Sequence, residues 1–127
     1  MNRALFCGSR DFTKKEIIHG IIDELPAGTV VIQGTYRGAD TIARDYALSK
    51  GMMVDDWPAW WNRQKRGAGP IRNQRMLDGS YPTQVYAFYR DYNNSQGTRD
   101  MIKRVLKTDD LFILIAEYEE KTDRWLS

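Results

Sequence analysis

The feature of this chain that most constrains its fold is the regular alternation of short apolar runs with segments of helical periodicity. Five apolar runs predict strands, at residues 4–7, 29–32, 52–57, 84–89 and 111–116. Between them, apolar residues recur every three or four positions and predict helices at about 17–25, 39–50, 71–77 and 98–106. Strands that are continuous apolar runs, each followed by a helix, indicate a parallel sheet covered on both faces.

The connections between these elements predict the layout of the sheet. Right-handed crossovers give an α/β fold with a doubly wound, open parallel sheet, Rossmann-like, of about five strands in the order 3-2-1-4-5. A chain of 127 residues is long enough for one domain with one core, and too short to expect two. Thr13 and Glu16 predict a capping box at the first helix. The charged tail, residues 117–127, is either a short packed helix or a frayed end.

Charge and cysteine content argue against several classes of function. The 19 basic and 17 acidic residues leave a net charge of +2, which is too small to favour nucleic acid or an anionic membrane as a partner. The one cysteine, Cys7, excludes an intrachain disulfide and a cysteine-based zinc cage, and His19 has no partner at metal-ligand spacing. The four-residue apolar run before Gly8 is too short for a secretory signal or a membrane span. We therefore expect a cytoplasmic protein.

Four loops that follow predicted strands carry the residues of a candidate binding site. In an open parallel sheet, ligands bind outside the carboxyl ends of the strands, near the point where the strand order reverses. Glycines and helix N-termini at these loops offer backbone N–H groups to an anion, and Arg10, Arg37 and Arg72 add donors that match phosphate or carboxylate. The sequence therefore predicts a phosphate-bearing ligand. The predicted ligand-binding residues are Gly8, Ser9, Arg10, Gly34, Thr35, Arg37, Gly38, Asp40, Trp60, Gly69, Arg72, Asn73, Gly97 and Thr98.

Several of these residues have a second interpretation. The loop at residues 34–38 matches neither the P-loop nor the G-x-G-x-x-G dinucleotide fingerprint. Asp40 is either a helix cap or an acceptor for a ribose hydroxyl. Trp60 belongs either to the core or to a site where it stacks on a base. The pair Asp55 and Asp56 is either solvated, or binds Mg²⁺ or acts as a general base.

The combination of motifs at these loops resembles a known family. The motifs are G-S-R-D-F at residues 8–12, R-G-A-D at 37–40, G-P-x-R-N-x-x-M at 69–76 and S-Q-G-T at 95–98. In their order and spacing, which extend over residues 4–116, the chain resembles the SLOG superfamily of Rossmann-like proteins, and within it the YspA-like branch. The resemblance implies a nucleotide or nucleotide-derived ligand, of the nucleoside phosphate, NAD or ADP-ribose type. It implies use as a sensor of a signalling nucleotide, a regulator, or a sequestering protein in viral anti-defence.

One departure from the family bears on catalysis. The resemblance implies that members of the phosphoribohydrolase branch carry the motif G-G-x-G-T-x-x-E in the loop before the last helix. In this chain Met101 stands at the position of the glutamate. Asp100 is one position away, about 100° around a helix. The sequence therefore favours binding over catalysis. An N-glycosidic or phosphate-bond hydrolase using Asp40, Asp55, Asp56 or Asp100 stays open, as do a bound Mg²⁺, a homo-oligomer and a degenerate scaffold for protein partners.

Overall fold

The fold is a single six-stranded sheet with helices on both faces, and it confirms the predicted α/β class. The computed structural model describes residues 2–60, 67–108, 110 and 112–126. The strands are β1 (Arg3–Gly8), β2 (Val30–Gln33), β3 (Met53–Asp56), β4 (Gln84–Tyr89), β5 (Leu114–Glu119) and β6 (Arg124–Trp125). The helices are α1 (Lys15–Glu24), α2 (Ala39–Ser49), α4 (Ala68–Ser80) and α5 (Gln96–Leu106), with a short 3₁₀ turn, η2 (Tyr92–Asn94).

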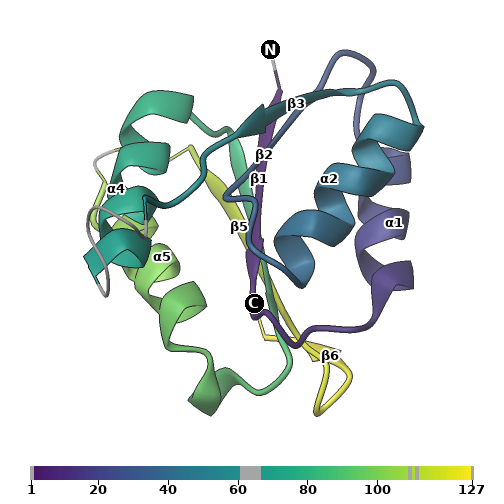
Figure 1. Cartoon of the computed structure of the whole chain (residues 1–127). Coiled ribbons are helices and arrows are strands. Elements are labelled where there is room, and N and C mark those ends of the chain that lie inside the picture. The colour runs from purple at the N-terminus through teal and green to yellow at the C-terminus, as the bar shows by residue number, and fades with distance from the viewer. Residues whose placement is uncertain (1, 61–66, 109, 111, 127) are drawn as a thin grey trace.

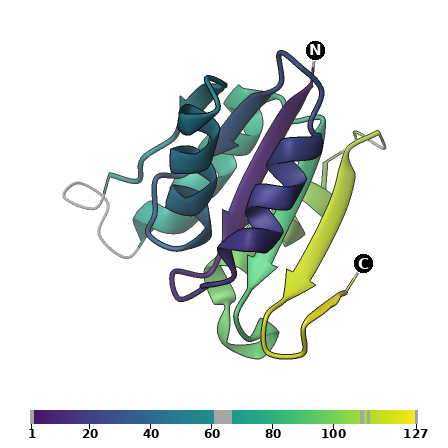
Figure 2. The ribbon, with the colours of Figure 1, turned by 90° about the vertical axis from the view of Figure 1, so that its right-hand side faces the viewer.

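The order of the strands places the reversal point where the sequence predicts it. The sheet runs β3-β2-β1-β4-β5-β6, and the first five strands are parallel. Helices α1 and α2 cover one face, and α4 and α5 cover the other (Figures 1 and 2). The reversal therefore lies between β1 and β4, the strands that separate the two helix pairs. No helix in the described part of the chain is long and apolar enough to cross a membrane.

Strand β1 divides its side chains between two hydrophobic clusters, because successive side chains of a strand point to opposite faces. Ala4 and Phe6 belong to the cluster under α1 and α2. Leu5 and Cys7 belong to the cluster under α4 and α5, with Met76 and Met101 among its other members. Cys7 therefore lies near the carboxyl end of the central strand, on the face that α4 and α5 cover.

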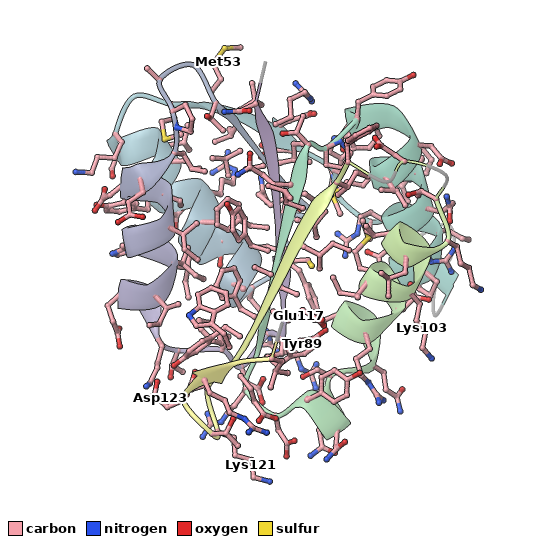
Figure 3. The ribbon with its side chains drawn as sticks, turned by 180° about the vertical axis from the view of Figure 1, so that it is seen from behind. Met53, Tyr89, Lys103, Glu117, Lys121 and Asp123 are labelled. Carbon is pink, nitrogen blue, oxygen red and sulfur yellow. The ribbon has the colours of Figure 1, made fainter. Side chains whose placement is uncertain are left out.

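Strand β5 lies three residues later than predicted. The sequence predicts residues 111–116, and the strand runs Leu114–Glu119; Leu111 itself lies outside the described residues. Its charged residues have partners: the Tyr89 hydroxyl donates to Glu117 Oε1 at 2.5 Å, and the Tyr92 N–H donates to Glu119 Oε2 at 2.8 Å. Figure 3 shows Tyr89 and Glu117 side by side. Because these bonds satisfy the carboxylates, a strand that contains two glutamates is tolerated.

The predicted capping box at α1 is wrong. The helix begins at Lys15, and its N-cap residue, Lys14, makes no side-chain capping bond. Thr13 points away from the helix and donates its hydroxyl to Glu120 Oε2 at 2.8 Å. The acceptor that the sequence assigned to Glu16 therefore comes from a residue more than a hundred positions away.

The C-terminal tail is neither a helix nor a frayed end up to residue 126. After β5 the chain turns at residues 120–123 and returns as β6, which pairs antiparallel with β5. The Trp125 ring lies 5.3 Å from the Tyr118 ring and 6.5 Å from the Phe88 ring, measured between centroids. The tail is thus a short hairpin that adds a sixth strand to the sheet.

Candidate functional site

A cavity of about 300 Å³ lies at the carboxyl end of β1, beside the N-termini of α4 and α5. Nine of the predicted ligand-binding residues line it: Gly8, Ser9, Arg10, Asp40, Gly69, Arg72, Asn73, Gly97 and Thr98. The residues that sequence reasoning missed are Cys7, Tyr36, Pro70, Met76, Asn94, Ser95, Gln96 and Met101. Three of this set, Cys7, Met76 and Met101, are core residues that reach the cavity, and their position follows from the alternation of β1 and the inner faces of α4 and α5.

Five predicted ligand-binding residues do not line the cavity: Gly34, Thr35, Arg37, Gly38 and Trp60. Arg37 is exposed. The Trp60 ring stacks against the guanidinium of Arg75, 3.9 Å from its centroid, and is 46% exposed. Neither the core position nor the place in the cavity that the sequence left open for Trp60 is observed.

Two of these glycines shape the cavity from behind. Gly38 has a φ of +94°, and a Cβ atom there would lie 2.4 Å from the Ser9 carbonyl oxygen. A Cβ atom at Gly34 would lie 2.1 Å from Arg72 Nη1. Only glycine allows such close approaches. These two residues therefore bring the loop at residues 34–38 against the loop at residues 8–12 and against α4.

Arg72 and Asn73 hold protein groups together at the base of the cavity. Arg72 Nη1 donates to the Gly34 carbonyl at 2.6 Å and to the Trp57 carbonyl at 3.3 Å, and Nε donates to Asn73 Oδ1 at 3.1 Å. Asn73 Nδ2 donates to Asp100 Oδ2 at 3.0 Å. Arg72 therefore ties the ends of β2 and β3 to α4, and most of the hydrogen-bonding capacity of both side chains is already used.

Asp40 is a buried carboxylate in the first turn of α2. Its Oδ2 accepts the N–H groups of Gly34 at 3.0 Å and of Tyr36 at 3.3 Å, so it holds the loop before the helix and does not cap α2 itself. Burial raises the pKa of Asp40 to about 6, although the positive charge of Arg72 and the two N–H bonds oppose that rise. Oδ1 makes no hydrogen bond with a described residue. This oxygen is free to accept from a ligand.

The other three candidate acids are held in ion pairs outside the cavity. Asp55 pairs with Arg3 at 2.6 Å, and Asp56 pairs with Arg44 at 3.1 Å. Asp100 pairs with Arg104 at 2.9 Å. Although partial burial acts the other way, the hydrogen bonds from Arg104 and Asn73 hold the pKa of Asp100 below its ordinary value. Within the described ranges, no group of three His, Cys, Asp or Glu residues could hold a metal ion.

The N-terminus of α5 opens into the cavity without a side-chain cap. The hydroxyl of the N-cap residue, Ser95, donates to the Asp91 carbonyl at 2.8 Å instead of accepting from the helix. The first N–H bonded to Ser95 is that of Arg99, so the preceding N–H groups of the helix, including that of Gly97, have no intrahelical acceptor. Thr98 is 6% exposed, lines the cavity, and makes no side-chain hydrogen bond with a described residue. These donors converge on one end of the cavity.

Comparison with known protein families agrees with this geometry. Residues 2–64 match the family model YAcAr, described as the YspA, cpYpsA-related SLOG family. Through this segment, the chain belongs to the YspA-related SLOG family. The segment carries the first two loops that line the cavity, whereas the motifs at 69–76 and 95–101 follow it in the chain and line the same cavity. No curated protein and no solved structure gives a significant match.

Proposed function

We propose that the cavity binds the phosphate of a nucleotide or nucleotide-derived ligand at the N-terminus of α5. The observation that carries this proposal is the uncapped N-terminus beside the Thr98 hydroxyl, which has no hydrogen-bond partner in the described part of the chain. Backbone N–H groups at a helix N-terminus and the helix dipole favour an anion, and a hydroxyl adds a further donor. Membership of the SLOG family supports a nucleotide-type ligand.

The remaining polar groups suggest how the ligand lies in the cavity. Arg10 is exposed on the rim and supplies a mobile positive charge for the phosphate. Asp40 Oδ1 accepts a ribose hydroxyl, the role that the sequence offered to Asp40. The neighbouring Asn73 amide is less available, because it is already bonded to Asp100. A volume of about 300 Å³ is at the small end of ligand sites. We therefore expect the cavity to enclose one nucleoside phosphate unit, alone or as part of a larger ligand such as ADP-ribose or NAD.

The valine variant Thr98→Val tests this assignment. Isothermal titration calorimetry measures the affinity for AMP, GMP, ADP-ribose, NAD and cyclic ADP-ribose, and mass spectrometry checks that each ligand stays intact. We expect the ligand that binds the wild type to bind Thr98→Val about tenfold more weakly, the loss typical of one hydrogen bond to a charged group. Stability should not fall, because the hydroxyl has no hydrogen-bond partner to lose among the described residues. The control for affinity is Thr108→Val, just beyond the C-terminal end of α5 and outside the cavity lining.

Two results would contradict the proposal. One is equal affinity in Thr98→Val and in the wild type, which would place the phosphate elsewhere. The other is a well-folded wild-type protein that binds none of these ligands, which would leave the scaffold interpretation. A ligand that binds and remains intact supports use as a sensor, regulator or sequestering protein.

A second candidate function is hydrolysis of an N-glycosidic bond, and Asp40 favours it. Of the four candidate acids Asp40 alone lines the cavity, and its pKa of about 6 suits a group that exchanges protons near neutral pH. In that reaction a water oxygen bonds to ribose C1′ as the bond from C1′ to the base nitrogen breaks. The ionised Asp40 carboxylate takes one proton from the water, and the departing base nitrogen takes a proton from solvent. Asp40 then returns its proton to solvent, which restores the carboxylate. Release of free base by the wild type, and intact bound nucleotide in Asp40→Asn, are the expected results of this reaction.

A further inference from the structure

The turn of the C-terminal hairpin touches two loops whose residues line the cavity. The first loop, residues 9–14, contributes Ser9 and Arg10, and the fourth loop, residues 90–95, contributes Asn94 and leads into α5. Figure 2 shows the hairpin at the same end of the sheet as both loops, and Figure 3 shows Lys121 and Asp123 at the opposite end from Met53. The hairpin itself does not line the cavity.

Glu120 bonds to the end of the first loop. Its Oε1 accepts the N–H of Thr13 at 2.8 Å and that of Lys14 at 3.3 Å, and its Oε2 accepts the Thr13 hydroxyl at 2.8 Å. A carboxylate at this point also interacts favourably with the dipole of α1. Lys14 Nζ donates to Asp123 at 2.7 Å, which adds a second bond between the hairpin and the loop.

Glu119 bonds to the fourth loop. Its Oε2 accepts the N–H of Tyr92 at 2.8 Å, its Oε1 accepts the Thr122 hydroxyl at 2.6 Å, and it is 7% exposed. Two backbone bonds run alongside, from the Glu120 N–H to the Tyr89 carbonyl at 2.7 Å and from the Lys121 N–H to the Arg90 carbonyl at 2.9 Å. The hairpin therefore fixes where the chain leaves β4 and turns toward α5.

The two loops are also bonded to each other at the cavity. The Arg90 N–H donates to Ser9 Oγ at 2.9 Å, and the Ser9 N–H donates to the Phe88 carbonyl at 2.9 Å. Ser9 is thus held from one side by the fourth loop, while Thr13 is held by the hairpin. The spacing between the two loops at the cavity therefore depends on these hydrogen bonds.

We propose that Glu119 and Glu120 are positioning residues of the ligand cavity, which set the spacing between the loop with Ser9 and Arg10 and the loop that leads into α5. The proposal rests on the proposed function for its consequence in binding, but the positioning itself is a property of the free protein. The adjacent glutamates divide the task, because one serves each loop. A change in the hairpin is therefore transmitted to ligand affinity without any contact with the ligand.

The test compares Glu119→Gln and Glu120→Gln with the control Glu24→Gln, an exposed residue at the end of α1. Amide hydrogen exchange is measured on the unliganded proteins, and affinity is then measured for the nucleotide that binds the wild type. Glutamine keeps the size of the side chain but replaces one acceptor oxygen with a donor. We expect exchange about tenfold faster at the directly bonded amides. It should also be faster at hydrogen-bonded loop amides that the carboxylates do not touch, that of Phe12 in Glu120→Gln and those of Asn94 and Ser95 in Glu119→Gln.

Protection of β1 and β4 should stay as in the wild type, and ligand affinity should fall in both variants and not in Glu24→Gln. Faster exchange confined to the directly bonded amides, with unchanged affinity, would overturn the proposal. Uniformly faster exchange through the sheet would also overturn it, since it would indicate that the glutamates stabilise the whole sheet and do not position the two loops. Because exchange is measured without ligand, a wild type that binds no nucleotide refutes the proposed function separately from the positioning.

Discussion

Gly38 lies where the loop at residues 34–38 packs against Ser9 and Arg10. Its backbone has φ +94° and ψ −132°. Residues with a Cβ atom rarely adopt this conformation, and here the added carbon would also lie 2.4 Å from the Ser9 carbonyl oxygen and 2.6 Å from Arg10 Cα. We expect Gly38→Ala to lower the free energy of unfolding by about 3 kcal/mol or more, as the sum of backbone strain and a backbone clash. Chemical denaturation of the variant measures this loss.

The control for this effect is Gly51→Ala. Gly51 also has a positive φ, +74°, but nothing lies within 4 Å of the position of its Cβ atom. It should therefore show only the strain, about 1 kcal/mol. Equal losses in the two variants would mean that the close approach of the two loops does not limit residue 38.

At the scale of single residues, the sequence predicted which loops form the site better than it predicted the directions of their side chains. Gly8, Ser9 and Thr98 follow strand ends or begin helices, so the topology alone places them at the cavity. Arg37 and Arg72 are the same residue type at the same edge, yet Arg37 is exposed and Arg72 binds two carbonyls in the interior. Arg37 lies in the loop before α2, whereas Arg72 is a buried residue of α4, and this difference in tertiary packing is contained in no local pattern.

Among the elements, β5 depends on one buried hydrogen bond from its neighbour. Tyr89 is fully buried, burial raises the pKa of its hydroxyl, and the protonated hydroxyl donates to Glu117 at 2.5 Å. Tyr89→Phe removes this donor and leaves the carboxylate less well satisfied. We expect a loss of about 1–3 kcal/mol in the free energy of unfolding, measured by denaturation. Tyr86→Phe is the control, because Tyr86 is on the same strand and is only partly buried; an equal loss there would contradict the prediction.

The same bond explains why some elements were predicted well and others were not. Strands β1 and β4 are continuous apolar runs, and their predicted positions agree with the structure to within one residue. Strand β5 includes Glu117 and Glu119, whose partners come from β4 and from the loop after it. The acceptor for the Thr13 N–H, just before α1, comes from Glu120 for a similar reason. Where the partner of a polar group is distant in sequence, hydrophobic periodicity and secondary-structure propensity do not reveal that partner.

For the whole molecule, Asp40 couples folding to pH. Its pKa is about 6 in the folded protein, mainly because of burial, against an ordinary value of 3.8. The folded state therefore binds the proton more tightly than the unfolded state does, so the contribution of Asp40 to stability is greatest below pH 4. It is lost as the pH rises from about 4 to about 6, and it changes little above that range. A shift of roughly two pKa units corresponds to at most about 3 kcal/mol.

The variant Asp40→Asn isolates this contribution. The asparagine oxygen can still accept the N–H groups of Gly34 and Tyr36, so the loop should keep its conformation, but the side chain no longer ionises. Asp91, Asp100 and Glu119 have lowered pKa values, and their stabilisation grows with pH in both proteins. The free energy of unfolding is measured for both proteins by denaturation from pH 3.5 to pH 7.5. Between pH 4 and pH 6, we expect the wild type to lose stability relative to Asp40→Asn as the pH rises. A constant difference across that range would show that Asp40 ionises with an ordinary pKa, and would remove the argument for it as a proton-exchanging group in the cavity.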